Sequence, residues 1–501
     1  MNHIILKNGQ PTAIRNIPEL EYPLFREHIL SLLVDPACHC MNYYGYKEND
    51  KNLRLLCCIG NDATSEIYVS SFIYELNEKH LLDSITRSYP GMHIFEREIS
   101  ENFGIEFAGN PWCKPVRYPF NRTDISKILN NYPFFQIDSD ELHEVGVGPI
   151  HAGIIEPGHF RFICNGEKVL HLEIHLGYQH RGIEHLFLKN KNLLHQHILA
   201  ESITGDSVVA NTAAYAMLME SLGNINIQDE VSDARTIAIE LERAAIHTGD
   251  LSALCTDIAY QLGASVFQGL RTTLINTFLT WCGNRFARRL VRAGANPFPI
   301  TADLKKTILN NLKKFESRFD EMADYMFNTP GVLARFEDAG IVTNEQAKLI
   351  QVVGMAARAS GMARDIRSSH PYLSFNKMVH VPVCLDSGDV QARAMIRRLE
   401  VTQSLKIIRD LLDKCDEASA TRKSEILQAA DSFGISLTEG WRGEHCHCAI
   451  TDEDGNLKHY KVKDPSMHNW LALALAVRNN DISDFPVCNK SFDLSYCGYD
   501  L

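Results

Sequence analysis

The chain has 501 residues, which is too long for one simple hydrophobic core and indicates two or more domains. Hydrophobic residues make up 45% and charged residues 22%, a balance typical of globular proteins. The formal net charge of −12 excludes a basic surface for nucleic acid, but an acidic subunit could dock onto basic partner subunits. No run of about 18 apolar residues is present, so no segment is expected to span a membrane.

Residues 1–120 are expected to form a small α+β domain. The segments Arg54–Ile59 and Glu66–Leu76 are apolar or alternating, which predicts two strands, with a turn at Gly60-Asn61-Asp62 between them. In the segment Phe95–Gly104 apolar residues recur about one turn apart, which predicts a helix that ends at its glycine.

Residues 121–147 are expected to be a connector, and their acidic stretch Asp138–Glu144 suits an exposed surface. A second, larger domain is predicted over residues 148–501. It begins with two predicted strands, Phe160–Cys164 and Lys168–Leu176, joined by a hairpin turn at Asn165-Gly166.

Long helical patterns dominate from His185 to about Cys415. A final β hairpin is predicted over Cys446–Val462, with its turn at Asp454-Gly455. The predicted fold class is therefore α+β, with a small α+β domain followed by a mainly helical domain that has small sheets at its start and near its C-terminus. The clearest helical patterns are Ile237–Leu262, Ala264–Ala295 and Leu304–Met326.

Cysteine and histidine alternate in His445-Cys446-His447-Cys448, which suggests a zinc site at first sight. In a strand, alternate side chains face opposite ways, so the two cysteines share one face and the two histidines share the other. That arrangement is a poor tetrahedral cage, and buried strand thiols are the preferred interpretation. Cys38-His39-Cys40 has the same weakness. The fourteen cysteines, with no secretory signal visible, are expected to be reduced thiols in the cytosol.

Several phrases of the sequence resemble subunits of known membrane complexes. Phe95–Trp112 (FEREISENFGIEFAGNPW) resembles the signature of the 30-kDa-type subunit of respiratory complex I. The rest of the chain resembles the 49-kDa-type subunit of complex I and the large subunit of [NiFe] hydrogenases. Fusion of both types is typical of group 4, energy-converting hydrogenase complexes. The phrases that carry the second resemblance are Gly148–His151, Glu156–Arg161, Gly177–Glu184, Glu240–Arg243 with His247, Gly354–Tyr372, Glu439–Glu444 and Lys463–Ser466.

The resemblance implies a [NiFe] centre held by two CxxC pairs, since thiolates suit nickel and low-spin iron. In this chain Thr204 and Ser207 stand at the first pair of positions, and Ser495 and Gly498 at the second. No CxxC exists anywhere in the chain. We therefore expect no metal in this chain, and an active hydrogenase is the least favoured interpretation.

Complex I relatives also lack these cysteines, and the resemblance implies that they bind quinone in the space instead. The tyrosine that contacts the quinone there aligns with Gly205 in this chain. The histidine ligand of the opening loop has no clean match, and His159 is the closest candidate, with His151 second. The implied quinone site is therefore incomplete in this chain, and a quinone is kept as a candidate ligand. No G-x-G-x-x-G follows a strand, so an association with NAD would come only through the complex I family.

The resemblance also suggests roles for other residues. Glu156 matches the glutamate that carries protons in hydrogenases; the alternative is a salt-bridged loop residue. Arg442 and Arg364 match residues that line the cavity in relatives, but each could equally be a plain surface arginine. Asp206 would line the metal pocket with Thr204, Ser207 and Ser495 and could carry a proton; the alternative is a filled, inert pocket. A final set is expected to hold the fold and a partner interface: His180, Arg181 and Glu184.

The sequence thus predicts a peripheral-arm subunit of a membrane-attached, ion-translocating oxidoreductase. A partner small subunit would supply a nearby [4Fe–4S] cluster, and antiporter-like membrane subunits would supply the ion path. The chain would lie in the cytoplasm on the inner face of the cell membrane. The rival interpretation is a non-catalytic scaffold that couples the movements of its partners. A tunnel to the Glu156 region would favour redox chemistry, and a packed pocket would favour the scaffold.

Overall fold

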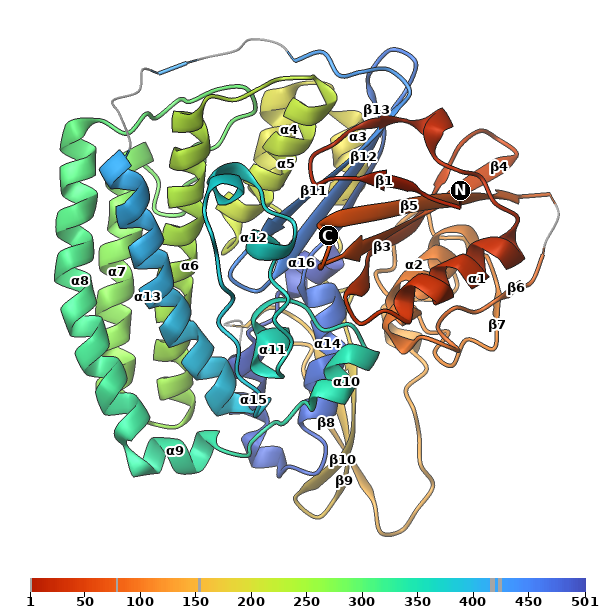
Figure 1. Cartoon of the computed structure of the whole chain (residues 1–501). Coiled ribbons are helices and arrows are strands. Elements are labelled where there is room, and N and C mark those ends of the chain that lie inside the picture. Colours follow the sequence, from red (N-terminus) through yellow and green to blue (C-terminus); the bar gives the residue numbers. More distant parts are fainter. Residues whose placement is uncertain (1, 78–79, 152–154, 415–419, 422–425) are drawn as a thin grey trace.

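The computed structural model describes residues 2–77, 80–151, 155–414, 420–421 and 426–501. The N-terminal sheet and its helices lie on one side of the molecule and a set of long helices on the other, with a central sheet between them (Figure 1). No helix in the described part of the chain is long and apolar enough to cross a bilayer.

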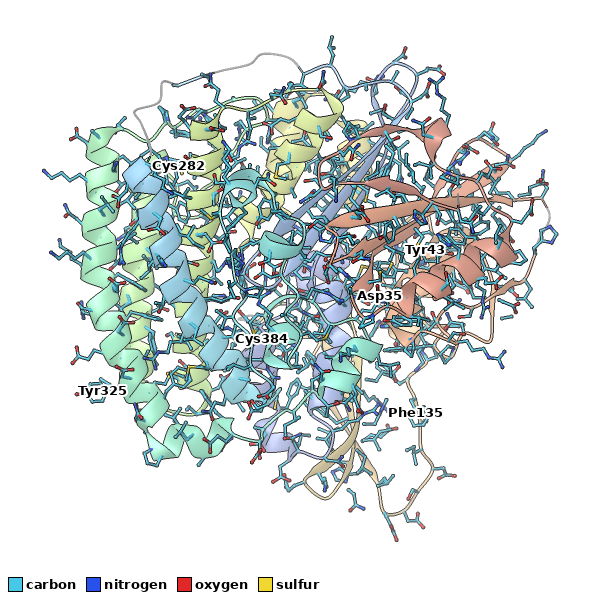
Figure 2. The ribbon with its side chains drawn as sticks, in the orientation of Figure 1. Asp35, Tyr43, Phe135, Cys282, Tyr325 and Cys384 are labelled. Atoms are coloured by element: carbon cyan, nitrogen blue, oxygen red, sulfur yellow. The ribbon has the colours of Figure 1, made fainter. Side chains whose placement is uncertain are left out.

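The N-terminal region is built on an antiparallel sheet of order β1-β5-β4-β3. Helix α1 (Tyr22–Leu33) packs on it through Phe25, whose ring lies 6.0 Å from that of Tyr43. Tyr43 is therefore an interior residue, whereas Tyr325 points outward from the far side of the molecule (Figure 2). Both predicted strands are confirmed, although Gly60 and Asn61 still pair within their strand. The strands are β1 (Ile4–Leu6), β3 (Cys38–Lys47), β4 (Asn52–Asn61) and β5 (Glu66–Glu75).

Helix α2 (His93–Phe103) confirms the second prediction for this region and ends at Gly104, whose φ is 72°. Its charged residues Glu96, Arg97 and Glu98 are nevertheless buried. Glu98 forms ion pairs with Arg117 and with Lys461, the latter at 2.5 Å. The helix lies at the junction of the two regions, so its charges find partners there instead of solvent.

The second sheet has the order β10-β9-β8 and contains the predicted hairpin. Strands β9 (His159–Asn165) and β10 (Lys168–His175) are antiparallel, and Gly166 in the turn has a φ of 56°. Strand β8 (His143–Val147) pairs with β9. The last residues of the expected connector thus belong to this sheet, because they extend its hydrogen-bond ladder.

The helical layer consists of α6 (Asp229–Asp257), α7 (Gln261–Cys282), α8 (Ala302–Asn328) and α13 (Val390–Lys414). They lie side by side in Figure 1. The predicted helix over Ala264–Ala295 is too long at its C-terminal end, because Gly283 adopts a φ of 75° and ends α7.

The central sheet joins the two regions, with the order β13-β12-β11-β2. Strand β2 (Thr12–Ala13), from the start of the chain, pairs with β11 (Ser432–Glu439). Strands β12 (Glu444–Thr451) and β13 (Leu457–Lys463) confirm the predicted C-terminal hairpin. Helix α5 (Val208–Leu222) packs against β11 and β12.

The predicted fold class is confirmed: a small α+β region is followed by a mainly helical region with small sheets. The remaining elements are α3 (Ile183–Lys189), α4 (Leu193–Ala200), α9 (Pro330–Phe336), α10 (Asn344–Leu349), α11 (Gly354–Ala359), α12 (Ile366–Ser369), α14 (Ser466–Ala476), α15 (Phe485–Phe492), α16 (Tyr496–Asp500), β6 (Leu82–Asp83) and β7 (Phe107–Ala108).

Candidate functional site

Thr204 and Ser207 lie in the turn between α4 and α5, and both are fully buried. The Asn211 side-chain amide donates to Thr204 Oγ1 at 3.1 Å and to the Ser207 carbonyl at 2.9 Å. His447 contacts the other end of that amide, with its Nε2 3.2 Å from Asn211 Oδ1. Tyr460 lies 2.7 Å from His447 Nδ1. Hydrogen bonds between uncharged groups therefore occupy the place where the first pair of thiolates would lie in a [NiFe] hydrogenase.

Ser495 and Gly498 lie at the start of α16, where Ser495 caps the helix. Ser495 Oγ accepts from the Gly498 N–H at 2.9 Å, and the Ser495 N–H donates to Ser466 Oγ at 2.9 Å. A Cβ placed on Gly498 would lie 2.7 Å from Thr204 Cγ2. The fold thus brings the two motifs together, as their alignment with the metal-binding pairs predicts.

Arg181 holds the two motifs in this arrangement. Its guanidinium donates to the Ile203 carbonyl at 2.8 Å and to the Cys497 carbonyl at 3.0 Å. His180 Nδ1 contacts the Asp500 carbonyl at 2.8 Å. Glu184 accepts from the Val462 N–H at 3.0 Å. These contacts hold the fold, and a role of the three residues in a partner interface stays a prediction.

Asp206 and Arg442 form the rim of the site. The Arg442 guanidinium donates to both Asp206 carboxylate oxygens, at 2.8 and 2.6 Å, and it lies 4.0 Å above the Trp441 ring. The Trp441 indole N–H also donates to the Asp206 carbonyl at 2.8 Å. Arg442 is buried, whereas 37% of the Asp206 side chain is exposed. This bidentate pair is fixed in geometry and open to solvent on the carboxylate side.

Asp464 and His445 complete the site, and no role was expected for either of them. A Cβ on Gly498 would lie 2.7 Å from Asp464 Cγ, so this carboxyl group fills part of the space where the fourth thiolate is expected. Asp464 Oδ2 lies 3.8 Å from His445 Nδ1, and neither atom has a hydrogen-bond partner among the described residues. Burial raises the pKa of Asp464 and, with nearby Arg442, lowers the pKa of His445 to about 3. His445 is therefore neutral at physiological pH. The only sequence signal for Asp464 was that it lies in the segment Lys463–Ser466, which resembles the corresponding segment of the related subunits.

Glu156 lies beside the second motif, where its Oε2 accepts from the Cys497 N–H at 3.4 Å. Burial, and then the Glu156 carboxylate, raise the pKa of the Cys497 thiol to about 12. The Cys497 side chain is therefore a neutral thiol and a poor metal ligand at neutral pH.

His151 and His159 close the opening loop on itself. His151 Nε2 lies 2.9 Å from the Gly158 carbonyl, and His159 Nδ1 lies 3.0 Å from the Gly148 carbonyl. Both imidazoles are thus engaged with the backbone. Gly158 lies against Tyr496, since a Cβ on this glycine would be 2.6 Å from the ring, and the loop therefore borders the second motif.

Arg364 lies elsewhere. Its guanidinium donates to Asp62 of the N-terminal region at 2.8 Å, so it ties the two regions together. The structure therefore brings Glu156, Asp206, Arg442, Thr204, Ser207 and Ser495 to one place, but not Arg364.

The residues of the site do not fit a [NiFe] centre, because hydroxyls, a glycine and a protonated thiol stand where thiolates are needed. Within the described ranges, no group of three or more His, Cys, Asp or Glu side chains is arranged to hold a metal ion. Cys446 and Cys448 do share one face of β12, with their sulfurs 3.8 Å apart. A cavity of about 1190 Å³ lies beyond α3 and α4, and none of the four substituted positions lines it.

Comparison with protein families places both halves of the chain. Residues 27–122 match the respiratory-chain NADH dehydrogenase 30-kDa subunit, and residues 263–433 match the 49-kDa subunit. Each matched range is similar to one subunit of the respiratory-chain NADH dehydrogenase. The chain joins the two subunit types in one polypeptide, and the residues of the site lie outside both matched ranges.

Individual relatives come from two kinds of complex. Hydrogenase-4 component G of Escherichia coli is 23% identical over 82% of this chain and 74% of its own length. The C/D-type subunit of the NADH-quinone oxidoreductase from Phocaeicola vulgatus is 27% identical over 80% and 83%. The alpha subunit of the membrane-bound hydrogenase from Pyrococcus furiosus is 27% identical over 70% and 85%.

Among solved structures, this chain resembles a chain of the membrane-bound sulfane sulfur reductase, which is described as an archaeal respiratory membrane complex. The TM-score is 0.67 at 20% identity, over 73% of this chain and 100% of the other. This likeness supports the fold of the chain.

Proposed function

We propose that the chain is a peripheral-arm subunit of a membrane-associated, ion-translocating oxidoreductase complex and that it works without a [NiFe] centre of its own. The observation that carries this proposal is the fusion of the two respiratory subunit types around a site whose metal-ligand positions are substituted. Relatives named as subunits of NADH-quinone oxidoreductase and of membrane-bound hydrogenase support it.

In this proposal a [4Fe–4S] cluster near the site belongs to a small partner subunit, and antiporter-like membrane subunits carry the ion path. The complex lies on the inner face of the cell membrane, and a quinone is the candidate electron acceptor. The chain itself contributes the Asp206–Arg442 pair at the rim and Glu156 beside it. The arginine holds the Asp206 carboxylate in one geometry.

A second candidate function is a coupling subunit with no chemistry at this site. It is favoured by the contact of Gly498 with Asp464 and Thr204, which leaves no room for even a methyl group at the fourth ligand position. In that case electrons pass only between the partners, and this chain transmits their movements.

Affinity purification from detergent-solubilised membranes, through a tag on this chain, tests the proposal. We expect an iron–sulfur protein and integral membrane proteins to co-purify in fixed ratio. Recovery of the chain alone, or with soluble partners only, would contradict the proposal. The variant Arg442→Lys then separates the two candidates, because lysine cannot make the bidentate contact. Lost turnover in a normally assembled complex favours a working site, and unchanged turnover favours the coupling subunit.

A further inference from the structure

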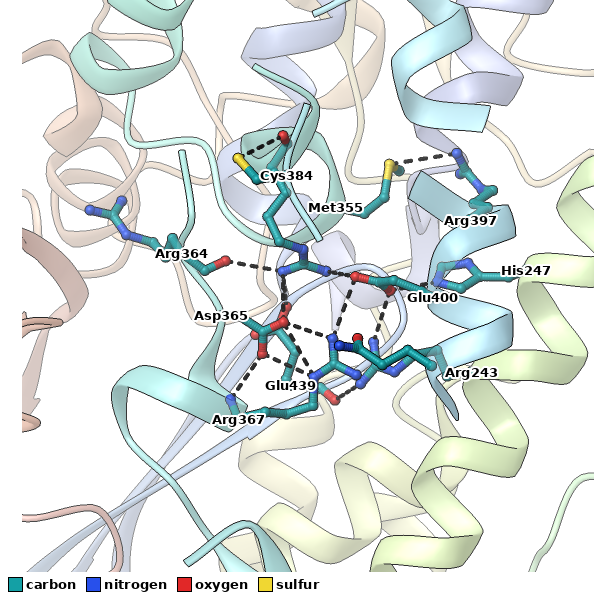
Figure 3. A network of polar contacts seen from close by, with 12 residues as sticks. Arg243, His247, Met355, Arg364, Asp365, Arg367, Cys384, Arg397, Glu400 and Glu439 are labelled. Atoms are coloured by element: carbon teal, nitrogen blue, oxygen red, sulfur yellow. Dashed lines mark hydrogen bonds and ion pairs between the residues drawn. The ribbon is translucent and has the colours of Figure 1, made fainter. Parts of the chain in front are cut away.

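Helices α6, α11, α12 and α13 and strand β11 enclose a cluster of charged side chains, shown in Figure 3. Arg358 occupies its middle and contacts Glu400 at 2.6 Å and Glu439 at 2.8 Å. Every member of the cluster is at most 1% exposed. The members are Arg243, Arg358, Arg367, Glu240, Asp365, Glu400 and Glu439, with His247 at the edge.

The charges of this cluster do not balance. Three arginines, which stay protonated at any physiological pH, face four carboxyl groups. With all four ionised and His247 neutral, one negative charge would remain buried without compensation, which is strongly unfavourable. The cluster therefore binds one proton, either on one of its carboxyl groups or on His247.

The ion pairs of the carboxyl groups distinguish between these protonation sites. Glu400 contacts Arg243, Arg358 and Arg367 as well as His247. Glu240 and Asp365 each contact two arginines. By contrast, the Glu439 carboxyl group contacts one arginine, Arg358, which three carboxyl groups share. Glu439 is thus the carboxyl group whose charge is least compensated.

We infer that Glu439 is a proton-binding site, a buried carboxyl group that takes up and releases one proton and thereby sets the net charge of the cluster. The inference goes beyond the proposed function and does not depend on it. Burial and the neighbouring Asp365 raise the pKa of Glu439 to about 7, which agrees with this assignment.

The groups that face Glu439 come from four other parts of the chain. Its Oε2 accepts from the Ile366 N–H at 3.1 Å, its own N–H donates to the Tyr372 hydroxyl at 3.0 Å, and its carbonyl accepts from Arg243 at 2.6 Å. Burial also raises the pKa of Tyr372, so this hydroxyl stays protonated. The charged groups that surround Glu439 are Arg243 and Glu240 on α6, Arg358 on α11, Asp365 and Arg367 at α12, and Glu400 on α13.

The site borders the connection between the two regions. Asp365 contacts Arg358, follows Arg364 directly and caps α12. Arg364 in turn holds Asp62 of the N-terminal region. Loss of the proton from Glu439 adds a negative charge beside Asp365, at the base of this connection. The occupancy of the site is therefore coupled to the segment that links the 30-kDa-like and 49-kDa-like regions.

Infrared difference spectroscopy on the complex, purified through this chain, tests the assignment. The spectrum of Glu439→Gln is subtracted from that of the unmodified complex at a series of pH values. Other buried carboxyl groups contribute to both spectra and cancel. We expect a protonated-carboxyl band at pH 6 that is lost by about pH 8. Glu444→Gln is the matched control, because Glu444 is equally buried but ion-paired with Lys463 and His39, and it should remove no such band.

Two outcomes would overturn the inference. If Glu439→Gln removes no protonated-carboxyl band, the proton lies on another group of the cluster. If Glu439→Gln fails to assemble while Glu444→Gln assembles, Glu439 is an ionised partner of Arg358, because glutamine reproduces the size and hydrogen bonds of the protonated acid. Neither outcome bears on co-purification with membrane subunits, so the proposed function is tested separately.

Discussion

Gly498 lies directly against the Asp464 carboxyl group, so that a Cβ on the glycine would be 2.7 Å from Asp464 Cγ. This contact fills the position that the fourth metal-ligating thiolate would occupy in a [NiFe] hydrogenase. Both residues are buried, and Asp464 is held by the Ser466 N–H at 2.8 Å, so it has little freedom to move aside.

We expect Gly498→Ala to destabilise the protein by about 1–3 kcal/mol, the usual range for overpacking a well-filled interior. A lower midpoint of thermal unfolding in the purified complex is the measurement. Gly205→Ala is the matched control, because a Cβ at Gly205, in the same site, would meet nothing within 4 Å. Equal midpoints for the two variants would show that the site has room at position 498.

The ion pair of Glu444 with Lys463 and His39 should make the protein sensitive to acid. These partners hold the pKa of the buried Glu444 well below its usual range despite the opposing effect of burial. A carboxylate with a lowered pKa stabilises the folded state above its unfolded pKa, about 4.3, and this contribution is lost as the pH falls below that value.

We therefore expect Glu444→Gln to unfold at a lower temperature than the unmodified protein at pH 7. Between about pH 5 and pH 3 the difference between the two should shrink. Glu453→Gln, at an exposed position in the turn between β12 and β13, should unfold at the same temperature as the unmodified protein. Parallel pH profiles for Glu444→Gln and the unmodified protein would contradict this account.

Several large apolar side chains are exposed, which predicts that the chain aggregates when it is expressed without partners. Val379 is 94% exposed, Phe120 88% and Ile150 82%. Partner subunits would cover those exposed apolar side chains that lie at an interface in the complex. Gel filtration of the chain expressed alone is the measurement, and a stable, monodisperse monomer would argue against partner-dependent stability.

Glu156→Gln tests proton transfer at the candidate site, because glutamine keeps the size of the side chain but cannot titrate. If Glu156 relays protons, the complex should assemble normally and lose turnover. Ser207→Ala is the control: it alters a buried hydroxyl that has no hydrogen-bond partner among the described residues and leaves every charge in place. Normal assembly and unmodified turnover of Glu156→Gln would exclude the relay and favour the coupling subunit.

Local patterns predicted much of the fold, because a strand or helix with one buried face leaves a period in its own sequence. Strand β5 and helix α2 were predicted for that reason. The hairpin β12–β13 was predicted from its turn at Asp454-Gly455, because every residue of β12 is buried and leaves no alternation. Strand β11 is buried in the same way and was missed. Helix α7 was extended beyond Gly283 because apolar residues continue past the turn.

The site was predicted in part. The resemblance located Thr204, Ser207, Ser495 and Gly498, and the structure brings them together. It could not locate Asp464, since only the three-dimensional contact with Gly498 shows that this carboxyl group fills the space. The partners of Arg358 were equally hidden, because Glu400 and Glu439 lie 42 and 81 residues away in the sequence.

The central claim is that this chain takes part in a membrane oxidoreductase without holding nickel. Elemental analysis of the purified complex, normalised to the amount of this chain, tests it most directly. The account predicts iron from the partner subunit and no stoichiometric nickel, because hydroxyls, a glycine and the Asp464 carboxyl group occupy the ligand positions. About one nickel per chain would contradict it.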